Sequence, residues 1–518
     1  MISTADAPPT TPSVIHTPRR TPCHGYVTIT PQPPRPRSPR PARNKLQKSS
    51  YDRWGLKSQL FTPQYFLIVG PKGAGKSAVS EFIRLSLEDR SGEHAVFSKT
   101  LNLDQISPGI SPLSAITSKL VSEEATGITD SAWRLFLSLR IFELVLQDHS
   151  CDLTRDVQVQ KLADDLRKSG LAAGDFPSVL RRVRENKTAI SLRGLIGKDW
   201  ASTEVDEVSV THLGEALIGL ILQAKSGNHF LLAIDGLDRI IADNRAYWTT
   251  LAALLRVSDD LHKKFRQAST DVRVLVMCRS DVFRRINFAD ADKIAGDSAL
   301  FIDWGAHQTT PADSHLWDYI AAKAEIGPRD LFALLPEFVT VGERKGNARL
   351  IKIAEYLLQF TRSTPRELTM LMKRVQEEIP AGGYATSDRV RVAADNFASR
   401  DLLTIVKAEA TGTVSSVVQD HLDEVLSNLP SATELTPEDL RTAISAAGLE
   451  SDTVRLFSEF LFMAGLLGNY DPQSGYVQFY HRRDTYKFKR RGPWTINRGL
   501  MYAFNIPYSR VRDDTSRQ

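Results

Sequence analysis

The amino-acid sequence predicts an α/β fold: a parallel sheet with a helical insert, followed by a helical lid and a winged-helix-like C-terminal domain. Three observations carry this prediction. Short apolar runs alternate with longer segments of helical periodicity up to about residue 308, as expected of a parallel sheet covered by helices. A glycine-rich loop directly follows the first apolar run. From residue 309 the pattern is almost entirely helical, until a turn and a short strand at 469–480.

The first apolar run and the loop after it form the most informative stretch. Residues 65–69 (YFLIV) are continuously apolar, which predicts a buried parallel strand. Apolar residues between Ala78 and Leu87 recur at helical spacing, so the order is strand, loop and helix, as in P-loop NTPases. The loop matches the Walker A pattern G-x-x-x-x-G-K-[ST]. Its residues are Gly70, Pro71, Lys72, Gly73, Ala74, Gly75, Lys76 and Ser77.

The residue types in this loop suit a polyphosphate. Glycines leave the backbone N–H groups open to phosphate oxygens, because no Cβ stands in the way. The helix that begins near Lys76 adds the positive end of its dipole, so we expect residues 70–78 to bind nucleotide. Lys76 is expected to reach the β- and γ-phosphates, and the Ser77 hydroxyl to hold Mg²⁺. The alternative is a glycine-rich turn that contains Lys and Ser by chance.

Length and composition describe an ordinary soluble protein. A chain of 518 residues should hold roughly three domains, and 25% charged with 42% hydrophobic residues is typical of globular proteins. No apolar run is long enough to span a membrane, and the N-terminus lacks the apolar segment of a secretory signal. The three cysteines are far apart and suggest neither a disulfide framework nor a zinc site. We expect a cytoplasmic protein with no membrane partner.

Basic charge is concentrated at both ends of the chain. Residues 1–50 hold eight Lys or Arg and one acid, and residues 481–518 hold ten Lys or Arg and three acids. Each end therefore carries +7, although the whole chain carries only +5. Such ends can contact nucleic acid or can simply be solvated, and both interpretations stay open.

These patterns divide the chain into five parts. The Pro- and Arg-rich segment 1–50 is predicted to be disordered, because it has too little apolar surface to bury. The predicted boundaries are an ATPase core at 51–308 with a helical insert at about 125–210, a helical lid at 309–385, a winged-helix-like domain at 386–490, and a basic tail at 491–518.

A second buried strand ends in an acid. Residues 230–235 (FLLAID) match the Walker B pattern, in which Asp235 would hold Mg²⁺, and Asp238 could act as general base. The alternative is a buried strand followed by an Asp-Gly turn. Asp104 and Asp303 also end apolar runs, but neither has a second acid three residues later. We therefore expect Asp235 and Asp238 to face the glycine loop from a neighbouring strand.

Further strands and helices supply candidate arginines. The strand at 272–278 ends at Arg279, where a side chain could sense the γ-phosphate, since ligands bind beyond the carboxyl ends of parallel strands. Arg284 and Arg285 follow on a predicted helix, either as a trans-acting finger or, preferably, as a solvated face. A last strand is predicted at 300–302.

In the lid, Thr364 can cap a helix and Pro365 suits its first turn, so Arg366 begins a helix. In the C-terminal part, three predicted helices at 414–428, 436–447 and 451–467 precede a turn and a strand, which is the outline of a winged helix. Ahead of the core, Tyr51 and Trp54 could pack on an adenine ring or anchor the first strand.

Taken in order, these stretches resemble the P-loop ATPases of the AAA+/STAND group, most of all a bacterial branch similar to origin-recognition-type ATPases. The resemblance covers about 62–378 and rests on GPKGAGKS (70–77), LLAIDGLD (231–238), CRS (278–280) and TPREL (364–368). It implies a sensor-1 role for Arg279, a sensor-2 role for Arg366 near the γ-phosphate, and a place for Pro365 near the base. Asp235 follows Lys76 by 159 positions, a longer interval than is usual in AAA+ proteins.

The function expected from the sequence is a switch driven by ATP and Mg²⁺ that hydrolyses ATP to ADP and phosphate. Neither the guanine-reading N-K-x-D nor the transporter signature S-G-G-Q is present, which favours ATP. One alternative is a DNA-binding protein with a regulatory or structural ATP site. Another is a scaffold that holds nucleotide without turnover. A homo-oligomer or a protein partner is compatible with the first interpretation.

Overall fold

The computed structural model describes 51–52, 55, 59, 64–90, 94–102, 123–172, 174–185, 189–191, 207–237, 245–286, 288, 290–305, 310–341, 349–379, 383–410, 414, 416–430, 432, 434–450, 452–481 and 486–504. The predicted tail 1–50, Trp54, Asp104 and Asp238 lie outside these residues.

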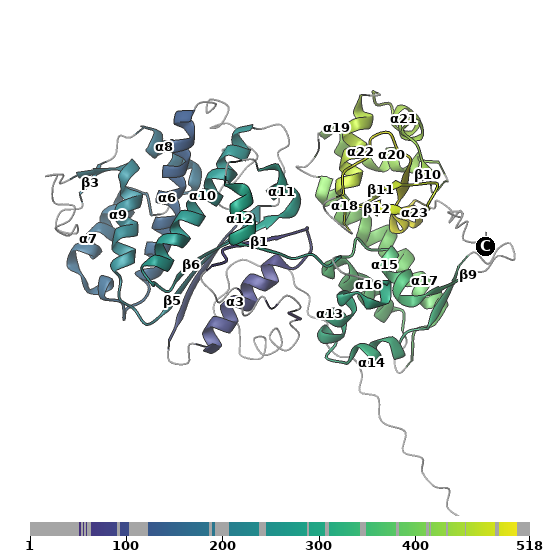
Figure 1. Ribbon diagram of the computed structural model, residues 1–518, viewed down its shortest axis with the longest axis horizontal. Helices are drawn as coiled ribbons and strands as arrows, with labels where there is room; N and C mark the ends of the chain where they lie inside the picture. The colour runs from purple at the N-terminus through teal and green to yellow at the C-terminus, as the bar shows by residue number, and fades with distance from the viewer. Residues whose placement is uncertain are drawn as a thin grey trace, which may run out of the picture.

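A five-stranded parallel sheet forms the centre of the N-terminal lobe (Figure 1). The strand order is β2-β5-β6-β1-β7, and every neighbouring pair runs parallel. The strands are β1 (Leu67–Gly70), β2 (Val96–Asn102), β5 (His229–Leu237), β6 (Val272–Arg279) and β7 (Ala299–Phe301). This sheet confirms the predicted α/β class. It differs from the expectation in one respect, because β6 lies between the loop-bearing β1 and the Asp235-bearing β5.

Helices cover both faces of the sheet, because alternate strand residues point to opposite sides. Leu231 and Leu275 share a buried cluster with Ile83 of α3, whereas Leu232 and Val274 share another with Leu217 of α9. Helix α3 thus lies across the sheet from the other helices of this lobe (Figure 1). The helices are α3 (Lys76–Arg90), α6 (Glu123–Val145), α9 (Val210–Gln223), α10 (Arg245–Gln267), α11 (Ser280–Arg285) and α12 (Ala291–Asp297).

Between β2 and β5, the residues that the structure describes are mainly helical, in agreement with the helical insert of the predicted fold. Its long helix α6 packs closely on α9, since a methyl group at Gly214 would lie only 2.9 Å from the Leu135 backbone nitrogen. The rings of Trp133 and Phe176 stack with centroids 3.7 Å apart. The remaining elements are η1 (Asp152–Arg155), α7 (Val157–Lys168), α8 (Phe176–Glu185) and a hairpin of β3 (Ala189–Ser191) and β4 (Glu207–Ser209).

The lid contains a β-hairpin that the helical pattern did not predict. Phe338 to Val341 are aromatic or β-branched and alternate between partly and fully buried, which favours a strand over a helix. The elements are η3 (Pro311–Asp313), α13 (His315–Lys323), α14 (Pro328–Ala333), β8 (Phe338–Val341), β9 (Arg349–Lys352), α15 (Ile353–Gln359) and α16 (Pro365–Glu377).

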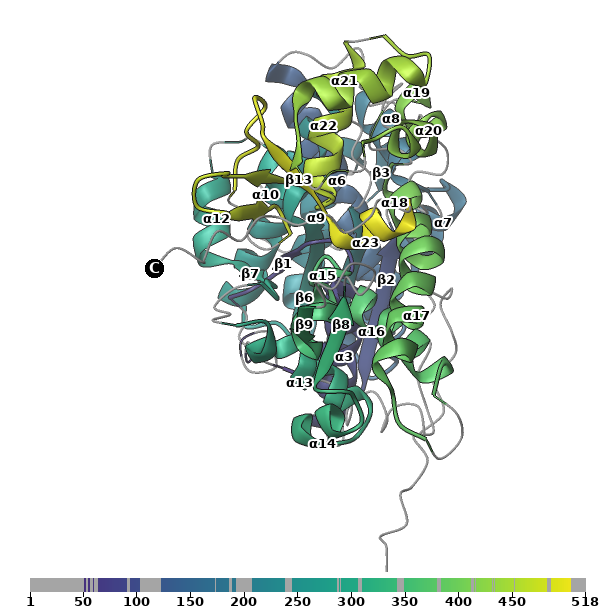
Figure 2. The same ribbon diagram turned by 90° about the vertical axis from the view of Figure 1, so that its right-hand side faces the viewer.

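The C-terminal domain combines helices with a four-stranded antiparallel sheet of order β10-β13-β11-β12, and it lies above the lid in Figure 2. Its helices are α17 (Ser387–Asn396), η5 (Phe397–Leu402, a π-helix), α18 (Leu403–Ala410), α19 (Ser416–Asp420), α20 (Leu422–Ser427), α21 (Pro437–Ala446), α22 (Thr453–Met463) and α23 (Arg498–Ala503). Its strands are β10 (Glu434–Leu435), β11 (Leu467–Tyr470), β12 (Val477–Phe479) and β13 (Trp494–Ile496).

The start of the predicted basic tail belongs to this domain. Residues 494–503 form β13 and α23, because Trp494, Ile496 and Leu500 supply apolar side chains that are almost completely buried. The expected boundary at 491 is therefore too early. Within the described part of the chain, no helix is long and apolar enough to cross a membrane.

Candidate functional site

The glycine loop connects the end of β1 to the beginning of α3. Gly73 and Gly75 have φ of +80° and +97°, which side chains other than hydrogen disfavour. The first-turn N–H groups of a helix point away from its hydrogen-bond ladder, and α3 begins directly after the loop. Lys76 is buried, and its ammonium donates to the carbonyl oxygens of Gly70 and Pro71, both at 3.1 Å. The loop therefore combines backbone donors with a buried cation, which suits an anion.

The structure brings Ser77 and Asp235 together although they are 158 positions apart in the chain. The Ser77 hydroxyl donates to Asp235 Oδ2 at 2.5 Å, and the other carboxylate oxygen accepts from the Gly236 backbone N–H at 2.8 Å. Of the two rival acids, Asp303 accepts from the Gly305 backbone N–H at 2.8 Å, and Asp104 is not among the described residues. Asp238, the predicted general base, follows the last described residue of β5.

Arg279 lies beside the loop at the end of β6, where it is in register with Gly70. The side chain is buried, and its guanidinium donates to both carboxylate oxygens of Asp281, at 2.9 and 2.6 Å. Burial alone would raise the pKa of Asp281, but the charge and hydrogen bonds of Arg279 outweigh it, so the pKa is lowered. Arg279 is thus held as a permanent cation at the carboxyl end of the sheet.

The lid contacts the loop directly. A methyl group on Gly73 would lie 3.3 Å from both Arg366 Cβ and Thr364 Oγ1. Thr364 caps α16 by accepting from the Glu367 backbone N–H at 3.2 Å, and Pro365 occupies the first turn. Arg366 is exposed and Pro365 is buried. The two predicted sensor arginines therefore approach the loop from different elements, β6 and α16.

Two aromatic residues, Trp304 and Tyr51, pack next to the glycine loop. Trp304, which follows β7, donates its indole N–H to the Ala74 carbonyl oxygen at 2.9 Å. Tyr51 stacks on Trp304 with a centroid distance of 6.3 Å, and its hydroxyl bonds His315 at 2.8 Å and Asp318 at 3.0 Å. Tyr51 thus joins the segment before the core to Trp304 and to α13 of the lid. The role of Trp304 had no signal in the sequence beyond its place at the end of an apolar run.

A cavity of about 330 Å³ adjoins the first half of the loop. Lys72 and Arg279 line it on the core side, Arg362 and Glu409 on the lid and C-terminal side. Above α11, the Arg284 guanidinium lies 6.0 Å from the centroid of the Tyr480 ring, so this arginine contacts the C-terminal domain. The cavity is therefore a junction between the core, the lid and the C-terminal domain.

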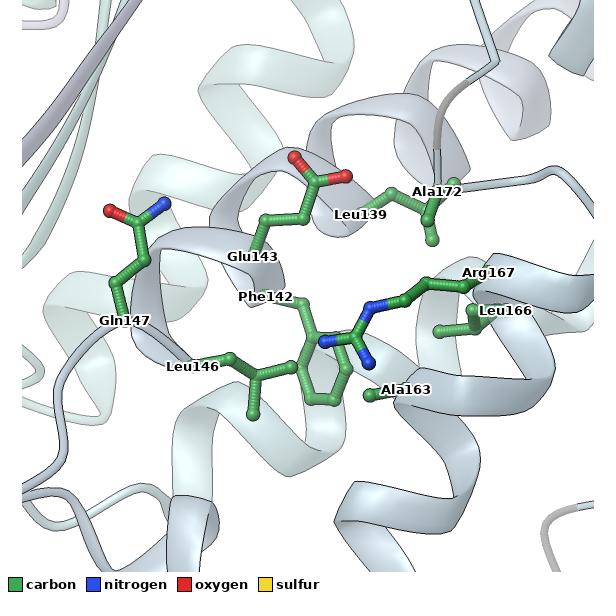
Figure 3. A pocket seen from close by; sticks show the side chains of 9 residues that line it. All are labelled: Leu139, Phe142, Glu143, Leu146, Gln147, Ala163, Leu166, Arg167 and Ala172. Carbon is green, nitrogen blue, oxygen red and sulfur yellow. The ribbon is translucent and has the colours of Figure 1, made fainter.

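A second cavity, of about 290 Å³, lies in the helical insert between α6 and α7 (Figure 3). Phe142, Leu166, Glu143 and Arg167 are among the residues that line it, and Figure 3 shows the Arg167 side chain reaching toward the Phe142 ring. Glu143 is paired with Lys99 at 2.9 Å and Arg167 with Asp164 at 2.6 Å. With both of these charges paired and no glycine among its lining residues, this cavity lacks the phosphate-binding features of the first site.

The donors near the loop suit a hydrated Mg²⁺. A hydroxyl and a carboxylate oxygen, from Ser77 and Asp235, are hard ligands of the kind that this ion prefers, and Mg²⁺ usually takes its other ligands from phosphate and water. Within the described ranges, no three or more His, Cys, Asp or Glu side chains cluster as a closed metal site. The pair thus fits an ion that arrives with a phosphate ligand.

Comparisons with known proteins show distant structural similarity. No family model and no curated protein sequence matches the chain. The Aeropyrum pernix ORC1 protein in complex with DNA has a TM-score of 0.36 and 12% identity, over 87% of this chain and 88% of that one. The A. pernix ORC2 protein (ADPNP–ADP complexes) has 0.30 and 14%, over 92% and 96%. The Thermotoga maritima RuvB Holliday junction branch migration motor has 0.29 and 13%, over 86% and 100%. With TM-scores this low, these similarities do not assign the chain to a family.

Proposed function

We propose that this protein is an ATP-binding, Mg²⁺-dependent ATPase of the AAA+ type that acts as a nucleotide-driven switch. The observation that carries the proposal is the Ser77–Asp235 hydrogen bond of 2.5 Å, formed at the N-terminus of α3 beside the glycine loop. A phosphate-loop hydroxyl next to a strand-end carboxylate is the donor pair expected of a nucleotide–Mg²⁺ site. A chance glycine-rich turn gives no reason for this pairing across the sheet.

In this mechanism the loop binds, and the surrounding side chains orient. Backbone N–H groups of the loop and of the first turn of α3 hold the phosphate oxygens, and Lys76 exchanges its two carbonyl partners for phosphate. Mg²⁺ would neutralise developing charge on the phosphates when held by Ser77 and Asp235. Arg279 and Arg366 place positive charge near the terminal phosphate, and Asp238 is proposed to accept a proton from the attacking water.

The first test compares two single variants. Lys76→Ala should weaken ATP binding about a hundredfold, because a hydrogen bond to a charged group is worth about 1.5–3 kcal/mol. Asp235→Asn should bind ATP but lose Mg²⁺-dependent phosphate release. Calorimetry with ATP measures the binding, and phosphate release measures the turnover.

Asp303→Asn is the matched control, since this acid also lies just beyond the carboxyl end of a strand, β7, but accepts from the Gly305 backbone N–H. It should keep its hydrolysis. Normal ATP binding by Lys76→Ala would rule out the proposed nucleotide site. Loss of hydrolysis in Asp303→Asn but not in Asp235→Asn would show that Asp303, and not Asp235, holds the Mg²⁺. An Asp238→Asn variant that binds ATP without hydrolysing it would support the role of Asp238 as base.

A second function, DNA binding by a winged-helix-like C-terminal domain, is favoured by one observation. Residues 487–491 beside the β11–β12 hairpin expose four basic side chains, of which Lys487, Lys489 and Arg491 are three. A fourth, Arg490, is paired with Glu459 at 2.6 Å. Tyr476, which is 55% exposed, lies on the same hairpin.

This second function predicts salt-dependent affinity. A surface that neutralises phosphates releases counterions, so the logarithm of the affinity falls with the logarithm of salt by about 0.9 per phosphate contact. Replacing Lys487, Lys489 and Arg491 with Gln should flatten this slope without changing ATP binding. If duplex DNA binds the wild type without salt dependence, the C-terminal domain is not the DNA-binding surface.

A further inference from the structure

One arginine connects the lid to the C-terminal domain. The Arg362 guanidinium donates to Glu367 of α16 through Nε, at 2.7 Å, and also through Nη2. It donates to Glu409 of α18 through Nη1 at 2.5 Å and through Nη2 at 3.1 Å. Nη1 also donates to the carbonyl oxygen of Ala464, which caps α22, at 2.9 Å. The three nitrogens of one side chain thus hold three helices.

This cluster is buried and complete. Arg362 is 6% exposed, Glu367 1% and Glu409 7%. The Arg362 backbone N–H also donates to Glu367, at 2.6 Å. Such an arrangement needs a reason beyond stability, because a buried ion pair is often no more stabilising than apolar residues of similar size. What the charges add is a fixed geometry among the groups they join.

The cluster is directly connected to the glycine loop. Arg362 lies two residues before Thr364, which with Arg366 packs against Gly73. The intervening Ser363 has a φ of +54°, so the turn between the cluster and the loop contact is conformationally restricted. On the opposite side, Glu409 lines the cavity next to Lys72 and Arg279, and both of these cations act on its carboxylate. A displacement of the loop therefore reaches the cluster by two routes.

We propose that Arg362 is a positioning residue that transmits nucleotide occupancy from the glycine loop to the C-terminal domain. The inference rests on the proposed ATP site and says how nucleotide binding there changes the position of the C-terminal domain. When nucleotide moves Thr364 and Arg366, the short turn moves Arg362, and α18 and α22 move with it because both are bonded to the same guanidinium. The C-terminal domain thus follows the lid as one unit.

The test is hydrogen exchange in α18 (Leu403–Ala410) and α22 (Thr453–Met463), with and without the non-hydrolysable analogue ADPNP and Mg²⁺. In the wild type, ADPNP should change the exchange of both helices by about fivefold or more, the usual lower range of coupling between sites. The test variant combines Arg362→Met, Glu367→Gln and Glu409→Gln, which leaves no buried charge unpaired. It should bind ADPNP normally, but α18 and α22 should no longer respond.

Arg374→Met is the matched control. Arg374 also joins α16 to the C-terminal domain, through Asp401 at 2.7 Å, but not through the turn that contacts Gly73. It should keep the response. Should the triple variant fail to fold, Arg362→Lys takes its place. The lysine ammonium keeps the positive charge, but it cannot reproduce the guanidinium hydrogen bonds to Glu367, Glu409 and Ala464 together.

The outcomes separate the two proposals. A triple variant that binds ADPNP and responds like the wild type overturns the role of Arg362 and leaves the ATP site intact. Loss of ADPNP binding in that variant, or loss of the response in Arg374→Met, also overturns a specific transmitting role. A wild type that binds no ADPNP rejects the proposed function itself.

Discussion

Gly73 combines two constraints at a single residue. Its φ of +80° is strained for any residue with a side chain, and a methyl group there would press on Thr364 and Arg366 at 3.3 Å. Gly75 has a φ of +97° but open space around it. Gly73 is therefore required both by its own backbone and by the packing of the lid.

Gly73→Ala should accordingly destabilise the protein by about 1 kcal/mol or more and also weaken ATP binding. Gly127→Ala is the comparison, because Gly127 lies in α6 with nothing near its Cβ position and should gain about 0.5–1 kcal/mol from better helix propensity. Thermal unfolding and ATP titration of both variants check this. Equal stability of the two would contradict the constraint at Gly73.

Glu409 gives a prediction about pH. Burial would raise the pKa of this carboxyl, but the charge of Arg362 outweighs burial and lowers the pKa from its usual 4.5. A group whose pKa is lowered on folding stabilises the folded state above its unfolded pKa, and this contribution is lost as pH falls through the folded value.

Glu409→Gln should cost about 3–5 kcal/mol at pH 7, because it leaves Arg362 with one buried partner fewer. The difference in free energy of unfolding between wild type and variant should shrink as pH falls below 4.5, because the Glu409 carboxyl of the unfolded chain is then protonated while that of the folded protein is still ionised. The charge-dependent part of the difference should be gone once pH is below the lowered pKa of the folded protein. Urea unfolding at several pH values measures it. A difference independent of pH would show that Glu409 is not ionised in the folded protein.

At the scale of elements, the cap of α16 connects helix stability to the site. Thr364 caps α16, and Thr386 caps α17 in the same way by accepting from the Arg389 backbone N–H. Thr364→Ala and Thr386→Ala should each cost about 1 kcal/mol. Only Thr364→Ala should also weaken ATP binding, since only Thr364 lies against Gly73. Equal ATP affinities in both variants would show that the Thr364 cap does not affect nucleotide binding.

The sequence could predict those elements whose signal is local. The strand–loop–helix unit at 65–87 and the strand ending at Asp235 each carry a complete pattern within a few residues, and the sheet confirms the predicted fold class. The β8–β9 hairpin was missed because its strands are short and flanked by helical patterns. The strand order could not be predicted, since pairing depends on contacts between residues far apart in the chain.

The partners of the candidate site were harder to predict for the same reason. Ser77 and Asp235 could be paired in advance, because a known motif joins them. Glu409 bonds an arginine 47 positions away, and Trp304 bonds Ala74 from 230 positions away, with no local pattern to connect either pair. Only the fold brings these side chains together.

At the scale of the whole molecule, the C-terminal domain contacts the core as well as the lid. Arg284 of α11 lies over Tyr480, which follows β12, and Arg362 joins the lid to α18 and α22. Tyr480→Ala should remove the cation–π contact, worth about 0.5–2 kcal/mol. Limited proteolysis should then cut the link between lid and C-terminal domain faster, whereas Tyr476→Phe, at an exposed position of the same hairpin, should leave the rate unchanged.

The place of β6 fixes the breadth of the candidate site. Two inter-strand spacings, together about 10 Å, separate β1 from β5. Backbone hydrogen bonds set the separation of β1 and β5, so substituting side chains can alter the charge between the loop and Asp235 but not the distance between these two strands. Inserting one residue into β6, in contrast, would shift its register against both neighbours. Arg279 would no longer lie opposite Gly70 of β1, and Cys278 would no longer lie opposite Leu237 of β5.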